Sequence, residues 1–131
     1  MACWLLKTEP DAYSFDDLER DQETRWDGVR NPTALLHIRT MRPGDGCVIY
    51  HTGAERQAVG LATVTTEPYP DPEAGDARLA VVDVRAGRRL ARPVPLADLK
   101  ANPLFADSPL LRISRLSVVP LTDEQYRALA G

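Results

Sequence analysis

Long apolar runs are absent from this sequence of 131 residues. No stretch approaches the ~18 consecutive apolar residues of a membrane-spanning helix, and the first residues, Met1 to Trp4, do not form a basic segment followed by an apolar signal core. Cys3 and Cys47 are the only cysteines, and both stand in apolar runs, where a reduced and buried thiol is the usual state. We therefore expect a soluble, cytoplasmic protein with no membrane segment and two packing thiols.

Signatures of the common enzyme classes are also missing. The chain has no Gly-x-Gly-x-x-Gly, no phosphate loop that ends in Gly-Lys-Ser/Thr, and no Gly-x-Ser-x-Gly nucleophile turn. Its two histidines, His37 and His51, lack the His-x-x-x-His or Glu-x-x-His spacing of a metal site, and two cysteines are too few for a four-cysteine zinc site. We expect no metal and no cofactor.

What the chain does contain is enough for one hydrophobic core. It is 44% hydrophobic and 27% charged, and a domain of this size buries somewhat under ~70% of its unfolded surface. No linker, internal repeat or low-complexity tract divides it. We predict a single domain over residues 1–131 and leave the oligomeric state open, with a monomer as the simpler expectation.

The pattern of apolar and turn residues indicates a mixed fold in which strands dominate. Ser14 and Thr122 begin capping boxes, and Asn31-Pro32 is an N-cap followed by proline at the first helical position. Strands are predicted over residues 3–7, 46–52, 59–66, 79–85 and 113–119, helices after Ser14 and Asn31 and over residues 96–101 and 123–130, and a rigid turn over residues 69–72.

Charge is distributed unevenly along the chain. Residues 1–76 hold 14 acidic and 7 basic side chains, whereas residues 77–131 hold 5 acidic and 9 basic ones. Four arginines between positions 85 and 92 surround a predicted turn, and arginine offers a planar fork to phosphate. The cluster is either a solvated hairpin tip or a set of contacts to a polyanion.

Two segments bring polar and aromatic residues to the edge of predicted elements. Trp26, among polar neighbours before a helix N-terminus, is either a core residue or the wall of a pocket. His51 ends an apolar strand and is either an acid/base group or a hydrogen-bonded structural histidine. Lys7 and Glu9, two apart at the end of the first strand, are either an acid/base pair or an ion pair.

Seven segments of the sequence, in their order and spacing, are similar to those of one known family: residues 4–11, 13–14, 25–31, 41–52, 59–62, 69–72 and 108–120. On these segments the sequence resembles the EVE domain family over residues 3–126. The resemblance implies an α/β (α+β) fold of the PUA-like type, a curled β-barrel with short helices packed around it, related in architecture to YTH and ASCH domains. It also implies a pocket for a nucleobase, because family members are thought to bind modified bases such as 5-methylcytosine.

The resemblance also assigns roles to individual residues. Trp26 would be the aromatic wall of the base pocket, with Val29 and Asn31 at its rim and the Asn31 amide offered to a base edge. The other base-pocket residues implied are Lys7, Glu9, Pro10, Tyr50, His51, Thr52 and Ser108. Phosphate contacts are predicted at Arg30, Arg89 and Arg112.

Three functions follow as alternatives. The first is a non-enzymatic reader that inserts a modified or unmodified base of DNA or RNA into this pocket, where stacking supplies ~1–3 kcal/mol per base. The second is an enzyme acting on nucleic acid or nucleotides, with His51, Lys7 or Glu9 as acid/base groups. The third is a small-molecule sensor or interaction module that uses the same pocket.

Overall fold

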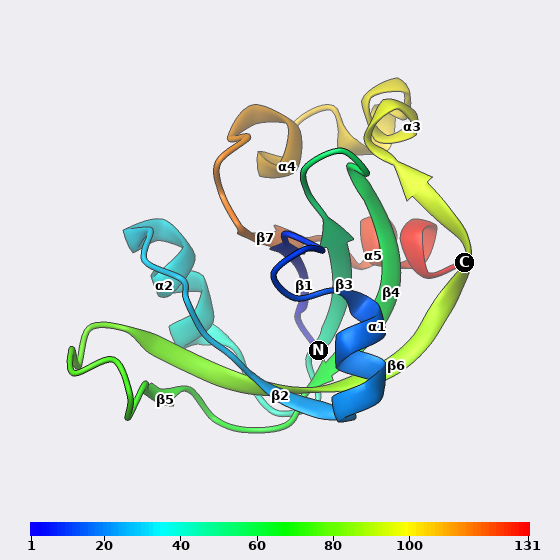
Figure 1. Cartoon of the computed structure of the whole chain (residues 1–131). Coiled ribbons are helices and arrows are strands. Elements are labelled where there is room, and N and C mark those ends of the chain that lie inside the picture. Colours follow the sequence, from blue (N-terminus) through cyan, green and yellow to red (C-terminus); the bar gives the residue numbers. More distant parts are fainter.

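The fold is a strongly curled sheet decorated by short helices, as shown by a computed structural model that describes residues 1–131 (Figure 1). The strands are β1 (Cys3–Thr8), β2 (Glu23–Trp26), β3 (Gly46–His51), β4 (Gln57–Val64), β5 (Tyr69–Pro70), β6 (Ala80–Pro95) and β7 (Val118–Leu121). The helices are α1 (Phe15–Asp21), α2 (Pro32–Thr40), α3 (Leu96–Ala101), α4 (Pro109–Arg112), α5 (Asp123–Ala130) and the 3-10 turn η1 (Pro103–Phe105). No helix is long and apolar enough to cross a membrane.

The seven strands form one sheet in the order β2-β6-β4-β3-β1-β7, with β5 paired to β6. β1 runs parallel to β3 and antiparallel to β7. The 16-residue β6 pairs with β2 over its first half and with β4 along its length, and the β4–β6 register shifts on both sides of Gly60. β4 and β6 approach each other closely at Gly87. A Cβ atom at this position would lie 2.9 Å from the Leu61 carbonyl oxygen, so the position requires glycine.

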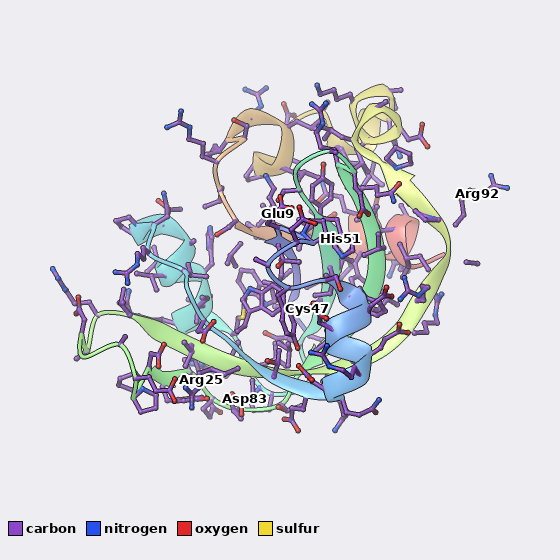
Figure 2. All side chains as sticks on the ribbon, viewed as in Figure 1. Glu9, Arg25, Cys47, His51, Asp83 and Arg92 are labelled. Carbon is purple, nitrogen blue, oxygen red and sulfur yellow. The ribbon has the colours of Figure 1, made fainter.

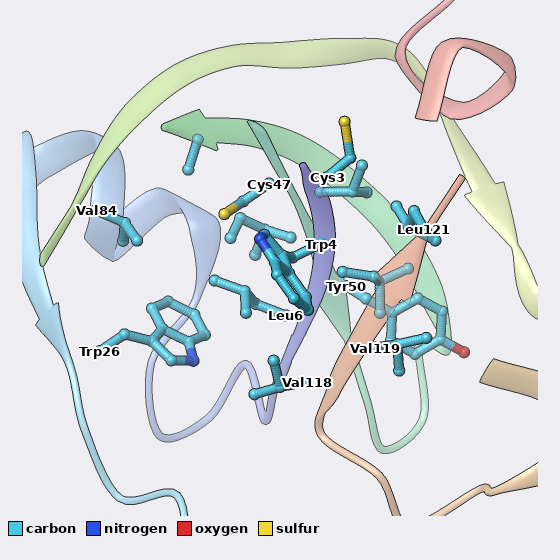
Figure 3. Close-up of a cluster of buried hydrophobic side chains, with 14 of the residues drawn as sticks. Cys3, Trp4, Leu6, Trp26, Cys47, Tyr50, Val84, Val118, Val119 and Leu121 are labelled. Carbon is cyan, nitrogen blue, oxygen red and sulfur yellow. The ribbon is translucent and has the colours of Figure 1, made fainter. Parts of the chain in front are cut away.

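The core lies on both sides of β1, because alternate residues of a strand point to opposite faces (Figure 3). Trp4 and Leu6 lie on the side of Trp26, whereas Cys3 lies on the side of Tyr50. These residues belong to one cluster of 31 buried hydrophobic side chains. Both cysteines are free and buried, which confirms the prediction of packing thiols.

Most predicted elements are confirmed, and three are corrected. Of the strand predicted over residues 113–119, only Val118 and Val119 belong to β7. The Ser108 cap and Pro109 begin α4, and the chain then turns before Val118. The arginines of residues 85–92 lie on the long strand β6 and not at a turn, because pairing with β4 continues past Arg85. Tyr69 and Pro70, predicted as part of a turn, form the short strand β5.

Candidate functional site

A cavity of about 610 Å³ lies between the end of β1, strand β2 and the segment that joins β2 to α2. Its volume is within the ~300–1,000 Å³ of small-molecule and cofactor sites. Ser117, from the loop before β7, completes the wall opposite β2. Three separate parts of the chain therefore build the cavity on the rigid end of the sheet.

The apolar wall of the cavity is Trp26. Its side chain is 7% exposed and belongs to the core cluster, yet it also lines the cavity, so the two interpretations of Trp26 from the sequence both hold. Tyr13 meets the indole edge-on, with ring centroids 6.4 Å apart and an interplanar angle of 85°. Val82 of β6 pairs with Trp26 in register. The aromatic wall is thus held in place before any ligand arrives.

The segment after Trp26 forms the adjoining wall. Asp27, Gly28, Val29 and Arg30 all line the cavity, and Gly28 adopts a φ of 79°, which favours glycine. Asn31 then caps α2, its side-chain oxygen accepting from the Ala34 amide at 3.0 Å. The cap fixes where this wall ends and commits the Asn31 oxygen to the helix.

Lys7 lines the cavity at the end of β1, and its side chain extends toward Tyr50, on the face of the strand opposite Trp26 (Figure 3). Its backbone amide donates to the Ser117 carbonyl at 2.9 Å, and its Nζ donates to the Ser114 carbonyl at 3.0 Å. The ammonium lies 6.0 Å from the centroid of the Tyr50 ring, and no carboxylate pairs with it. Burial lowers the pKa of Lys7. Because an ammonium carries three donors and no acceptor, two N–H groups remain for a ligand with acceptor atoms.

Arg25 also lines the cavity, and its guanidinium contacts three side chains of the β5–β6 hairpin. It faces Asp83 across the β2–β6 pair, donates to the Tyr69 hydroxyl at 3.4 Å, and lies 3.6 Å from Asp71 and 3.5 Å from Glu73 (Figure 2). Tyr69 in turn donates to Asp83. The hydrogen bond with Tyr69 raises the pKa of Arg25. These contacts hold the guanidinium in one position and tie β5 to β2.

The residues predicted at the end of β3 lie away from the cavity. His51 is buried, its Nε2 accepting from the Phe15 amide at 3.0 Å and its Nδ1 bonded to Glu55 at 2.9 Å. The hydrogen bond from His51 lowers the pKa of Glu55. Tyr50 is buried in the sheet, and the Thr52 hydroxyl lies 3.4 Å from the Thr8 carbonyl oxygen. This group joins β3 to α1 and to the end of β1.

Three other predicted pocket residues, Glu9, Pro10 and Ser108, are not among the residues that line the cavity. A Glu9 carboxylate oxygen accepts from the Asp11 amide at 3.2 Å, and Pro10 is half-buried in the same turn. Ser108 is buried and caps α4, accepting from the Leu110 amide at 3.1 Å. Their side chains shape loops next to the site.

The three predicted phosphate-binding arginines differ in their partners. Arg30 lines the cavity and has no carboxylate partner. Arg112 pairs with Asp107 at 2.8 Å. Arg89 contacts the carboxylates of α1 and lies with its guanidinium carbon 5.1 Å from the Phe15 ring centroid.

Sequence reasoning assigned no role in the pocket to Tyr13, Thr24, Arg25 or Ser117, although all four line the cavity. The alternation of Thr24 and Trp26 is a strand signal, but β2 has only four residues and was not predicted. Ser117 has no local signal, since only the pairing of β7 with β1 brings it beside Lys7.

A curled α+β sheet of this topology, with a preformed aromatic-walled cavity at one end, defines a small PUA-like domain with a ligand site. An ASCH protein from Zymomonas mobilis has the same fold at 15% identity, with a TM-score of 0.64 and coverage of 97% of this chain and 92% of that one. The chain belongs to the EVE domain family, whose sequence model matches residues 2–131.

Two further relatives are closely similar. An NMR structure of a protein from Rhodopseudomonas palustris shares 39% identity and a TM-score of 0.93, over 99% of this chain and 91% of that one. Human thymocyte nuclear protein 1 is 30% identical over 94% of this chain and 70% of its own length. A crystal structure of that human protein in complex with DNA containing 5-methylcytosine has a TM-score of 0.90 at 29% identity, over 99% of this chain and 96% of that one.

Proposed function

We propose that this protein binds DNA and holds a modified cytosine base in the cavity walled by Trp26. The observation that carries the proposal is the preformed cavity itself, with the buried indole of Trp26 on one wall. The human relative, which shares the fold over nearly the whole chain, is in complex with DNA containing 5-methylcytosine.

The cavity meets the physical needs of a base that leaves its stack. Trp26 offers an aromatic or apolar contact worth ~1–3 kcal/mol per stacked base. Polar residues of the lining, among them Thr24 and Asp27, offer a hydroxyl and a carboxylate to the base edge, where cytosine carries a carbonyl oxygen, a ring nitrogen and an amino group. A buried methyl group adds only ~0.8 kcal/mol, so selectivity for the modified base depends on a close fit around that carbon.

We propose binding without catalysis. The acid/base hypothesis named His51, Lys7 or Glu9. Both ring nitrogens of His51 are engaged by Phe15 and Glu55, and the Lys7 ammonium donates to the Ser114 carbonyl. Glu9 lies outside the cavity lining. This arrangement supports a reader that recognises a base and releases it unchanged.

The test substitutes the aromatic wall while keeping the core filled. Trp26→Leu retains apolar volume but removes the ring, and we expect it to weaken binding to an oligonucleotide with 5-methylcytosine by ~5- to 150-fold. Trp26→Phe, the matched control, keeps an aromatic ring and should retain most of the affinity. Thermal unfolding verifies that both variants fold. Binding by Trp26→Leu at the parent affinity would overturn the proposal.

A further inference from the structure

The cations around the cavity fall into two groups, according to whether a carboxylate neutralises them. Arg25 contacts Asp71 and Glu73, and its positive charge is largely balanced. Arg30, in contrast, is exposed at the cavity and has no carboxylate within 4.0 Å. Charges without an internal partner keep their full attraction for a phosphate.

Arg115 is another unpaired arginine, and it lies in the loop that carries Ser117 to the cavity. It is exposed in the loop that joins α4 to β7. One residue before it, the Ser114 carbonyl accepts from the Lys7 ammonium at 3.0 Å, and two residues after it, Ser117 lines the cavity. Arg30 comes from the β2–α2 segment on the other wall. Two cations without a carboxylate partner therefore belong to two separate segments that contribute residues to the cavity wall.

Carboxylates make a path of the nucleic acid over the β5–β6 hairpin electrostatically unfavourable. A smaller cavity of about 280 Å³ lies behind the wall formed by residues 27–30, and Asp71 and Glu73 line it. Asp76, whose pKa is lowered to about 2 by Arg78, is in the same hairpin. Arg30 also lines this smaller cavity, so it stands between the carboxylates of the hairpin and the larger cavity, and phosphates that approached over the hairpin would meet those carboxylates.

We propose that the DNA backbone crosses the opening of the cavity from Arg30 to Arg115, so that these arginines contact the phosphates on either side of the bound nucleotide. The inference rests on the proposed function and specifies how the polymer lies. Arg89 is outside this path because it is held against α1 and Phe15. Arg92, also exposed and unpaired, projects from the far side of β6 (Figure 2).

Salt titration of binding tests the path. Each phosphate contact contributes about 0.7–0.9 to the slope of log affinity against log salt concentration. We expect Arg30→Gln and Arg115→Gln each to reduce the slope by about this amount, and the double variant by about twice as much. Arg92→Gln removes the same charge far from the opening and should leave the slope unchanged. Equal slopes for all three single variants would overturn the inference.

Neutral methylphosphonate linkages locate the contacts. We expect a methylphosphonate on one side of the modified base to cancel the effect of Arg30→Gln, and one on the other side to cancel the effect of Arg115→Gln. If binding depends on Trp26 but shows no such coupling, the backbone path is wrong and the base pocket stands. If no oligonucleotide binds at all, the proposed function and the path are both wrong.

Discussion

Trp26 shows how one residue serves both the core and the site. Its indole is buried among the residues that hold β2 against the sheet, and one part of it forms the cavity wall. A side chain fixed by packing loses little conformational freedom when a base stacks on it. The same packing means that any large change at Trp26 also affects stability, so the aromatic contribution is measured best with variants that conserve volume.

The pH dependence of binding reports whether the charge of Lys7, at the edge of the cavity, contributes to affinity. Because burial lowers its pKa from the ordinary value of 10.5, the ammonium loses its proton at a lower pH than a solvated lysine does. We expect affinity for the modified oligonucleotide to fall as the pH rises through this lowered pKa, below 10.5. Lys7→Arg keeps its charge at these pH values, and its affinity should stay level over the same range.

A stability measurement separates this effect from unfolding. In the window between the lowered pKa and 10.5, the unfolded chain binds more protons at Lys7 than the folded chain, so the contribution of Lys7 to the free energy of unfolding rises with pH. Binding and this contribution should therefore change in opposite directions. Affinity of the parent protein that is independent of pH up to 10.5 would contradict a role for the Lys7 ammonium.

His51 is expected to act on stability and not on recognition. Its Nε2 accepts from the Phe15 amide, and His51→Ala leaves this buried N–H without an acceptor at a cost of ~1–3 kcal/mol. Urea denaturation measures the loss. Glu55→Gln, which keeps an oxygen acceptor for Nδ1 at an exposed position, should stay within ~0.5 kcal/mol of the parent protein. A His51→Ala variant of full stability that no longer distinguishes modified bases would contradict this assignment.

At the scale of elements, α1 is held against the sheet at a position where β4 has no side chain. Phe15 is fully buried, and its ring fills the space over Gly60, where an added Cβ would overlap it. We expect Gly60→Ala to cost ~1–3 kcal/mol in urea denaturation, since overpacking moves the helix. Phe15→Leu in the same chain should recover part of that loss. Unchanged stability in Gly60→Ala would mean that α1 is not packed in this way.

Elements with strong local signals were predictable from the sequence. The capping boxes at Ser14 and Thr122 and the N-cap at Asn31 all form, and β1 and β3 follow their apolar runs. β2 and the second half of β6 were not predicted, because their polar residues become strands only by pairing. β2 pairs with the first half of β6, and the second half of β6 pairs with β4.

The residues of the candidate site were also predictable only in part. Of the residues that the family resemblance implied for the base pocket, Lys7, Trp26 and Val29 line the cavity, and those of β3 do not. A resemblance in sequence marks residues that the family shares, and sharing arises from folding as well as from binding. The two hydrogen bonds of His51 explain such a residue without a ligand.

At the scale of the whole molecule, the charge of −3 opposes binding to a polyanion, and only local cations favour it. Several arginines are neutralised by carboxylates within the fold, including Arg25 and Arg89. The proposed path uses only two of the unpaired cations, so we expect a salt slope that corresponds to about two contacts. A slope that required many contacts would show that another surface binds the polymer.

The measurement that tests the central claim most directly is equilibrium binding to matched DNA and RNA oligonucleotides carrying one cytosine, 5-methylcytosine or 5-hydroxymethylcytosine, at two salt concentrations. We expect DNA with a modified cytosine to bind ~4-fold or more tightly than unmodified DNA, the ratio that one buried methyl group supplies. The preference should persist when salt weakens all affinities together. Equal affinity for modified and unmodified DNA, or no binding to either, would contradict the claim that this cavity recognises a modified base.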